Sequence, residues 1–512
     1  MIAPMHNSLR EAIRAGRLVE HHHPWQRTVV TPEVWAEATR LLSSGAATLV
    51  GLWGDAGQVH MALHDEARHD LGVLSLECPN MCFPSVGQSH APAIRLERAI
   101  RDLWALEPKG LVDTRPWLDH GTWDRTTDDG RRAVPHAARQ RYPFLPAEGE
   151  SLHQIPVGPV HAGIIEPGHF RFTANGEAVV RLEQRLGYVH KGIESLMAGA
   201  TLERAATLAG RVSGDSTVAY AIAFARAVEA ATGAEVPKRA IWLRALMGEL
   251  ERLANHFGDI GAICNDAAFA MMHAQCGHLR EQVLRVADRS FGHRLMMDQV
   301  VPGGVRRDLS QEGADLILAF LKDSRKRFPE LVELYDNTAS LQDRTVGTGF
   351  LSPDLARQFG CGGYIGRATG RAVDARRHPG YPPFDELQFE VPVLEDGDVN
   401  ARIWIRISEV EQSIDLIEHI LDRLPPGAIS CHVSSMLSAA HGREGMALTE
   451  GFRGDVLVWL RLQPDGRIER CHLRDPSWFQ WPLLESAVEG NIVADFPLCN
   501  KSFNCSYSGH DL

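Results

Sequence analysis

The chain has 512 residues, which is enough for about three domains and for a large buried core. Hydrophobic residues make up 44% and charged residues 23%, so a mainly disordered chain and a coiled coil are both excluded. The 53 basic residues against 65 acidic ones give a net charge of −12. A negative surface repels phosphate backbones, and nucleic acid is therefore not expected as a partner.

The nine cysteines are scattered along the chain without paired CxxC clusters, which favours a reducing cytoplasm over a disulfide framework. No stretch approaches the ~18 apolar residues that a membrane-spanning helix needs, and the N-terminus lacks the apolar core of a signal peptide. The sequence therefore predicts no direct membrane span. Any membrane association is expected to run through partners.

Residues 1–124 are predicted to form a small α+β domain. Apolar runs at 47–50, 59–63 and 73–76 indicate strands, and Gly54–Gly57 indicates a turn between the first two. The run His21–His23 is interpreted as a solvated patch rather than a metal site, because nothing fixes the imidazoles. Residues 125–154 are dense in charge, proline and glycine, which is typical of a linker.

Residues 155–512 are predicted to form a mainly helical bundle flanked by small antiparallel sheets. Leu246, Leu250, Leu253, Phe257 and Ile260 recur every three or four residues after Pro237, which predicts a long buried helix from Lys238. Further helices are expected at 214–232, 267–292, 309–325, 327–341 and 410–424. Strand pairs are expected between 388–393 and 401–407, and between 455–462 and 467–473.

The loop at residues 158–169, GPVHAGIIEPGH, brings two histidines and a carboxylate close together. Its prolines and glycines predict a shaped loop, on which His161, Glu166 and His169 could handle protons. The plainer interpretation is that these are ordinary polar residues bonded to the backbone. GxGxxG, GxxxxGK[ST], HExxH and GxSxG are all absent, so nucleotide binding is not expected.

The stretches GPVHAGIIEPGHFRF, RALMGELERLANHFGDIG, VVPGGVRRDL and EGFRGDVLVWLRL occur in that order. Together they resemble the large subunit of membrane-bound [NiFe] hydrogenases and the homologous quinone-site subunit of respiratory complex I, over residues 155–512. Before them, LERAIRDLWALEP resembles the signature of the small complex I subunit that docks beside the large one. Glu97, Arg98 and Asp102 match this signature, whereas Ala99 and Ala105 depart from it. The resemblance implies a fusion of both subunits.

Active hydrogenases of this family hold nickel and iron with two cysteine pairs, R-x-C-G-x-C and D-P-C-x-x-C. In the first motif this chain keeps Arg211 but has Ser213 and Ser216 in place of the two cysteines. In the second motif it keeps Cys505 but has Ser508 in place of the other cysteine. A serine hydroxyl is neither acidic nor soft enough to replace a thiolate bridge, so no metal is expected at these positions. Asp511 matches the acid that follows the second pair.

In complex I the emptied site reduces quinone with electrons from an iron–sulfur cluster in a neighbouring subunit. His161 matches the quinone-site histidine, but the matching tyrosine is Leu208, and the EPGH loop has the hydrogenase form. This combination of complex I and hydrogenase features best resembles the energy-converting-hydrogenase-related proteins. These are similar to the large subunit of formate hydrogenlyase but lack the nickel ligands. The resemblance implies small iron–sulfur and antiporter-like integral membrane subunits as partners, at the inner face of the cell membrane.

Two hypotheses follow from the resemblance. In the first, the chain passes electrons to a quinone or another small acceptor, with ion translocation coupled to the reaction. The proton-handling residues would then be His161, Glu166, His169 and Asp511, and the pocket would be lined by Arg211, Ser213, Ser216, Cys505 and Ser508. In the second, the pocket is vestigial and the chain only couples a redox partner to ion-pumping subunits.

Overall fold

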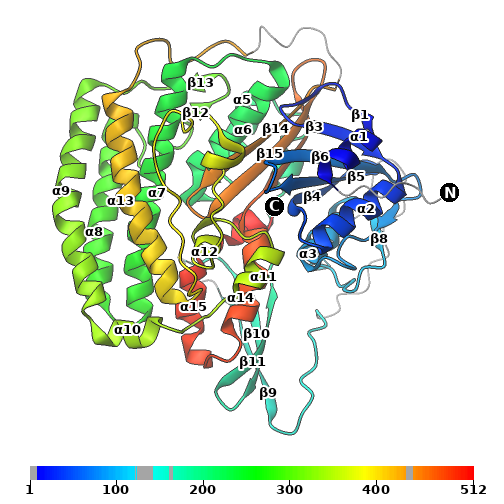
Figure 1. The fold of residues 1–512 in the computed structure, drawn as a ribbon, viewed down its shortest axis with the longest axis horizontal. Coiled ribbons are helices and arrows are strands. Elements are labelled where there is room, and N and C mark those ends of the chain that lie inside the picture. The colour runs from blue at the N-terminus through cyan, green and yellow to red at the C-terminus, as the bar shows by residue number, and fades with distance from the viewer. Residues whose placement is uncertain (1–7, 122, 124–141, 161–164, 434–441) are drawn as a thin grey trace.

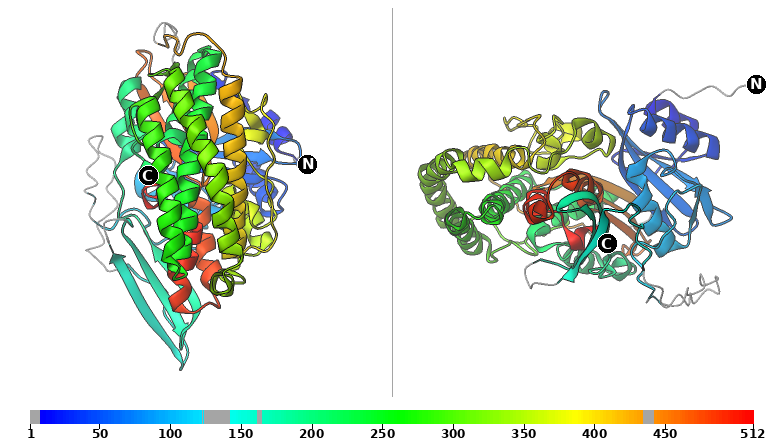
Figure 2. Two further views of the ribbon diagram at one scale, coloured as in Figure 1. Left: turned by 90° about the vertical axis from the view of Figure 1, so that its left-hand side faces the viewer. Right: turned by 90° about the horizontal axis from the view of Figure 1, so that it is seen from below.

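The structure is a computed structural model that describes residues 8–121, 123, 142–160, 165–433 and 442–512. An N-terminal sheet lies at one end and a row of long helices at the other (Figure 1). A second sheet, formed late in the chain, lies between them. Seen from the side, the long helices run next to one another (Figure 2). This mixed arrangement confirms the predicted α+β class, a helical bundle with small sheets.

The N-terminal sheet is built on three antiparallel strands, β4 (Thr48–Asp55), β5 (Gln58–Asp65) and β6 (Asp70–Glu77). They confirm the three strands that the apolar runs predicted. The loop between β4 and β5 has two residues and places Gly57 at φ 72°, a conformation that favours glycine. The sheet is completed by β3 (Gln26–Val30), parallel to β6, and by β1 (Arg17–Leu18). Its helices are α1 (Leu9–Ala15), α2 (Pro32–Ser43) and α3 (Ile94–Trp104).

The long helices follow the predicted periodicity closely. Their bounds are α6 (Thr217–Thr232), α7 (Lys238–Asp266), α8 (Ala270–Phe291), α9 (Gln311–Asp336) and α13 (Val399–Asp422). α7 has 29 residues, or about 43 Å at 1.5 Å per residue. It packs against α8 on one side and α13 on the other, so it is buried around most of its circumference. The predicted break between 325 and 327 is wrong, because α9 runs on through Pro329 and only α10 (Ala339–Thr345) is separate.

The predicted strand pair 388–393 with 401–407 is wrong. Residues 401–407 belong to α13, and 388–393 form neither helix nor strand. Ile403, Ile405 and Ile407 alternate along the sequence and so imitate a strand. α13 is buried on several sides, however, so its apolar residues need not keep to one helical face.

The second sheet contains β14 (Glu444–Gly451), β15 (Gly454–Leu462) and β16 (Ile468–Arg474), and it confirms the predicted pair 455–462 with 467–473. β2 (His22–His23) pairs with β14 in parallel. His22 is therefore 4% exposed, and its Nδ1 lies 2.6 Å from the carbonyl oxygen of Trp25. The interpretation of these histidines as a solvated patch is wrong for His22, because the strand pairing buries it.

A separate sheet of β9 (Leu152–Val160), β10 (Gly168–Asn175) and β11 (Ala178–Arg185) projects from the body of the molecule (Figure 1). The remaining short elements are β7 (Cys82–Pro84), β8 (Glu107–Lys109), β12 (Val300–Val301), β13 (Gly304–Val305), α4 (Ile193–Met197), α5 (Leu202–Ala209), α11 (Pro353–Gln358), α12 (Gly363–Arg367), α14 (Ser477–Val488), α15 (Phe496–Phe503) and α16 (Tyr507–His510).

The N-terminal sheet and the second sheet pack against each other through aromatic side chains. The ring of Trp53 on β4 lies 5.6 Å from that of Trp459 on β15 and stacks on His472 of β16 at 4.9 Å. Both tryptophans are almost fully buried in a cluster that both sheets share. The division into 1–124, a linker at 125–154 and 155–512 stays a prediction. The described residues on either side of it form one continuous core.

α4 is fastened to β16 by a buried ion pair, which predicts a pH-dependent stability. Burial alone would raise the pKa of Glu194, but Arg470 at 2.7 Å and His472 hold that pKa at about 2, below the ordinary 4.5. Because the folded-state pKa is lowered, its stabilisation is present above pH 4.5 and is lost as the pH falls to about 2.

We expect Glu194→Gln to lower the free energy of unfolding by about 3 kcal/mol at neutral pH. The difference from the wild type should shrink to nearly zero towards pH 2 in urea titrations followed by circular dichroism. Glu203→Gln, on the exposed face of α5, serves as the control and should change stability by less than about 0.5 kcal/mol. A constant difference across this pH range would contradict the prediction.

None of the described helices combines the length and the apolar character that crossing a membrane requires.

Candidate functional site

Three segments that lie far apart in the sequence meet in front of the N-terminus of α6. They are the turn 213–216, the β14–β15 turn at Arg453, and the segment 504–508 that follows α15. The Ser213 hydroxyl donates to Asp215 Oδ1 at 2.6 Å, and the Ser506 hydroxyl donates to Ser213 Oγ at 3.2 Å. This group of side chains, Ser213, Asp215, Ser216, Arg453 and Ser506, is called the serine cluster below.

The ion pair between Asp215 and Arg453 is the centre of the serine cluster. Two guanidinium nitrogens of Arg453 lie 2.9 and 2.5 Å from the two carboxylate oxygens of Asp215. The first of them also donates to Ser216 Oγ at 3.2 Å. Burial alone would raise the pKa of Asp215, but the guanidinium holds that pKa well below its usual range. The pair is therefore charged at neutral pH, and it fixes the orientation of both serines.

Glu166 reaches this region from the loop before β10. Its Oε2 accepts a hydrogen bond from the backbone N–H of Ser508 at 3.0 Å. Lys191 approaches from the opposite loop, where its amine donates to the carbonyl oxygens of Arg211 and Val212 at 2.9 and 2.8 Å. Burial lowers the pKa of Lys191, and the charges of Glu166 and Asp511 partly oppose this. A carboxylate and an amine thus lie beside the serine cluster.

The four positions that hold nickel and iron in hydrogenases do not suit that metal pair here. Ser213 and Ser216 direct their hydroxyls to Asp215, so their oxygen atoms are already hydrogen-bonded. Burial raises the pKa of the Cys505 thiol far above its usual range, which disfavours the thiolate. Ser508 is 3% exposed and adds a third hydroxyl. One thiol and three hydroxyls are a poor donor set for nickel or low-valent iron.

Not all predicted site residues come together. His169 lies on β10, where its Nδ1 is 2.8 Å from the carbonyl oxygen of Gly158 and its Nε2 accepts from Arg171 at 3.3 Å. Its described hydrogen-bond partners lie within the β9–β10 sheet and not in the serine cluster, and its catalytic role stays a prediction. Burial lowers the pKa of His169. His161 lies outside the described residues.

Asp511 and Arg211 lie at the edge of the site. Asp511 accepts from the backbone N–H of Val189 at 3.0 Å and lies 2.9 Å from Nδ1 of His510. The carboxylate thus ties the last residues of the chain to the 187–192 loop. Arg211 forms a half-exposed ion pair with Asp298 at 2.7 Å. Its place in the lining of the pocket stays a prediction.

Sequence reasoning missed the charged residues at the centre. Asp215 stands at an unspecified position of the first matched motif, and Arg453 lies inside the family-like EGFRG stretch without a pattern of its own. Neither Ser213 nor Ser216 makes a side-chain capping bond to α6. Glu251 of α7 does so instead, accepting from the N–H groups of Val218 and Ala219 at 2.7 and 3.0 Å.

The family-like signature residues on α3 hold a loop that contacts the C-terminal segment of the site. Glu97 accepts from the Ser85 hydroxyl and from two loop N–H groups, and Asp102 accepts from the N–H of Trp117 at 2.6 Å. Trp117 in turn donates to Nε2 of His510 at 3.3 Å. The matched residues therefore position a loop that contacts the C-terminal segment of the site. Within the described ranges, no group of three or more histidine, cysteine or acidic side chains is arranged to hold a metal ion.

The chain is similar to several known proteins. The family described as respiratory-chain NADH dehydrogenase, 49 Kd subunit, matches residues 266–443. Formate hydrogenlyase subunit 5 of Escherichia coli is 32% identical over 439 residues, which are 84% of this chain and 77% of that protein. An NADH-quinone oxidoreductase chain of Syntrophobacter fumaroxidans is 31% identical over 353 residues, 69% of this chain and 94% of that protein.

Among solved structures, the membrane-bound sulfane sulfur reductase, an archaeal respiratory membrane complex, contains a similar chain. The TM-score is 0.65 at 25% identity, and the match covers 71% of this chain and 99% of that one. The resemblance found in the sequence is thereby confirmed. The chain belongs to the superfamily of large subunits that membrane-bound hydrogenases share with respiratory NADH–quinone oxidoreductases.

Proposed function

We propose that the chain is the large subunit of a membrane-associated oxidoreductase complex and that the serine cluster with Glu166 forms its acceptor site. The observation that carries the proposal is the hydrogen bond between the Glu166 carboxylate and the Ser508 N–H. It brings the Glu166 carboxylate to the matched metal-ligand segment, which supports a proton-exchanging role for that carboxylate. The relatives are named as subunits of formate hydrogenlyase and of NADH-quinone oxidoreductase, which supports a redox role.

The acceptor would be a quinone or another small molecule. Reducing a quinone to a quinol takes two electrons and two protons. The scattered cysteines of this chain offer no ligand set for a relay, so a small iron–sulfur subunit would supply the electrons. Glu166, Asp511, His161 and His169 would supply protons.

The same proposal includes partners at the membrane. Relatives include a membrane-bound hydrogenase subunit of Pyrococcus furiosus, 30% identical over 365 residues. We infer that this chain docks peripherally, on the inner face of the membrane, against integral subunits that include antiporter-like ones. Electron transfer in the site would then be coupled to ion movement.

A second candidate function has its own support. The serine hydroxyls bond to Asp215, Arg453 and one another, so the centre of the site is internally satisfied. Leu208 also stands where the family's tyrosine would complete the quinone pair. Both features favour a structural subunit that couples its partners and does no chemistry of its own.

Glu166→Gln separates the two functions. It keeps the shape of the side chain but removes the titrating proton, so we expect turnover of the purified complex to fall about 10-fold or more. The rate would be measured as reduction of decylubiquinone by dithionite-reduced viologen, with subunit content measured on the same sample. The coupling function predicts unchanged turnover.

The matched control is Glu177→Gln, in the exposed turn between β10 and β11. It should change neither turnover nor subunit content. A Glu166→Gln complex that turns over at the wild-type rate would contradict the acceptor-site proposal. A complex that loses subunits in proportion to activity would contradict it as well.

A further inference from the structure

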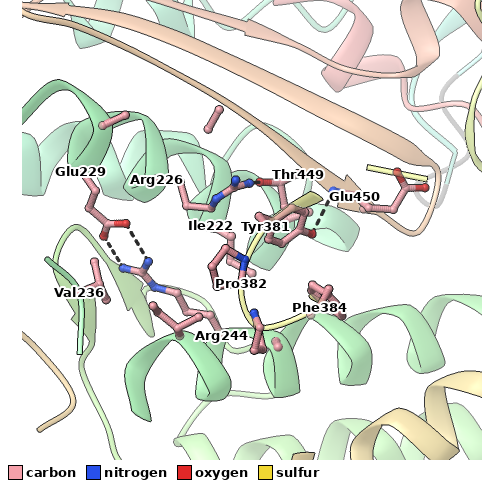
Figure 3. Close-up of a pocket in the computed structure, with 18 of the residues that line it drawn as sticks. Ile222, Arg226, Glu229, Val236, Arg244, Tyr381, Pro382, Phe384, Thr449 and Glu450 are labelled. Atoms are coloured by element: carbon pink, nitrogen blue, oxygen red, sulfur yellow. Dashed lines mark hydrogen bonds and ion pairs between the residues drawn. The ribbon is translucent and has the colours of Figure 1, made fainter. Parts of the chain in front are cut away.

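A cavity of about 270 Å³ lies between α6, α7, β14 and the 381–384 segment (Figure 3). This is near the lower end of the roughly 300–1000 Å³ that small-molecule pockets occupy. Its wall is mainly apolar and includes Ile222, Val236, Ile241, Pro382, Phe384 and Met446. None of the serine-cluster residues lines it, so it is a separate site.

Arg226 brings a positive charge into this apolar wall. Its Nη1 donates to the carbonyl oxygen of Leu448 at 2.6 Å and to Thr449 Oγ1 at 3.0 Å, and the guanidinium lies 4.0 Å from the ring centre of Tyr381. In the part of the chain that the structure describes, its Nε and Nη2 make no hydrogen bond, and no carboxylate forms an ion pair with it. Burial lowers the pKa of Arg226.

The other charged residues of the wall already have hydrogen-bond or ion-pair partners. Glu229 pairs with Arg244 at 2.6 and 3.0 Å (Figure 3). It also accepts from the N–H of Gly303. Glu249 pairs with Arg376, and Glu450 pairs with Arg367. The remaining carboxyl, Glu251, caps α6, and burial raises its pKa to about 8. Of the two arginines in the described wall, Arg244 has a carboxylate partner and Arg226 has none.

Gly248 keeps the cavity open from the side of α7. Glycine in a helix interior costs about 1 kcal/mol relative to alanine, so it usually marks a close approach by another group. Here a Cβ on Gly248 would meet only Ile222 Cδ1, at 3.8 Å. No described part of the protein uses the space that this glycine leaves, which points to an occupant that the chain does not supply.

We propose that this cavity binds a small amphipathic molecule with one anionic group, whose anion bonds to Nε and Nη2 of Arg226 and whose apolar part fills the space beside Gly248. One guanidinium without a partner suits one negative charge, and the apolar wall suits an alkyl or aryl body. The inference does not depend on the acceptor-site proposal. Each can fail while the other holds.

Octanoate and 1-octanol, titrated into the full-length chain by calorimetry, test the proposal. They share an alkyl chain and differ in charge, so octanoate should bind saturably and at least about 10-fold more tightly than 1-octanol. Arg226→Gln should remove this preference by weakening octanoate about 10-fold or more while leaving 1-octanol nearly unchanged. Gly248→Leu should abolish the binding of both.

Two variants on α8 serve as matched controls. Gly277→Leu adds the same side chain to a helical glycine with open space around it, and Arg285→Gln removes an exposed arginine. Both should leave octanoate affinity unchanged. Equal affinities for octanoate and 1-octanol would overturn the proposal, as would unchanged octanoate binding in Gly248→Leu or the absence of saturable binding. Thermal unfolding of each variant confirms that it is folded, and Arg226→Lys, which should keep part of the preference, replaces Arg226→Gln if that variant does not fold.

Discussion

Arg453→Met is expected to lower the free energy of unfolding by about 3–5 kcal/mol, the cost of leaving one member of a buried ion pair without its partner. Asp215 would lose the guanidinium that holds its pKa low, and its buried carboxyl would be left without a compensating charge. Arg453 also donates to Ser216 and to the carbonyl oxygen of Asn504, so both halves of the serine cluster would loosen. Urea unfolding of the purified chain, followed by tryptophan fluorescence, measures the loss.

Two further variants determine whether the unpaired charge causes the loss. Arg285→Met breaks an exposed pair with Glu281 and should cost no more than about 1 kcal/mol. The double variant Asp215→Leu with Arg453→Met removes both charges, so it should recover a large part of the lost stability. A double variant less stable than Arg453→Met alone would show that packing, and not the uncompensated carboxylate, dominates.

The elements that the sequence predicted well are those with a single dominant signal. β4, β5 and β6 alternate with short turns, and α7 carries apolar residues at helical spacing over 29 residues. The region 401–407 failed because its alternating isoleucines belong to a helix that is buried on several sides. The periodicity of one segment does not report how many neighbours will cover it.

The sequence also predicted some parts of the candidate site and missed others. The family-like spacing predicted that residues 213–216 and 505–508 would lie together, and the contact between Ser213 and Ser506 at 3.2 Å places them so. Arg453 is 238 positions from Asp215 in the chain, and no local pattern links the two. His169 was grouped with Glu166 because the two are close in sequence, but the strand geometry of β10 turns His169 towards Gly158.

The purified complex is expected to contain nickel only at background level and neither to evolve nor to oxidise hydrogen. Nickel in this architecture needs four thiolates, two of which also bind iron. Here the matched positions hold Ser213, Ser216, Cys505 and Ser508. The first two hydroxyls point to a charged Asp215, and the Cys505 thiol has a strongly raised pKa. A metal would have to compete with the hydrogen bonds that both hydroxyls make to Asp215.

Elemental analysis of the intact complex measures its nickel content, and a hydrogen-uptake assay with methyl viologen measures hydrogen oxidation on the same sample. A nickel hydrogenase carried through the same purification verifies the assay. Cys505→Ala is the matched variant: because one buried thiol holds nickel only weakly, its nickel content should equal that of the wild type. About one nickel per chain, lost in Cys505→Ala and accompanied by dye reduction, would overturn the donor-set argument, because three hydroxyls and one thiol would then suffice to hold the metal.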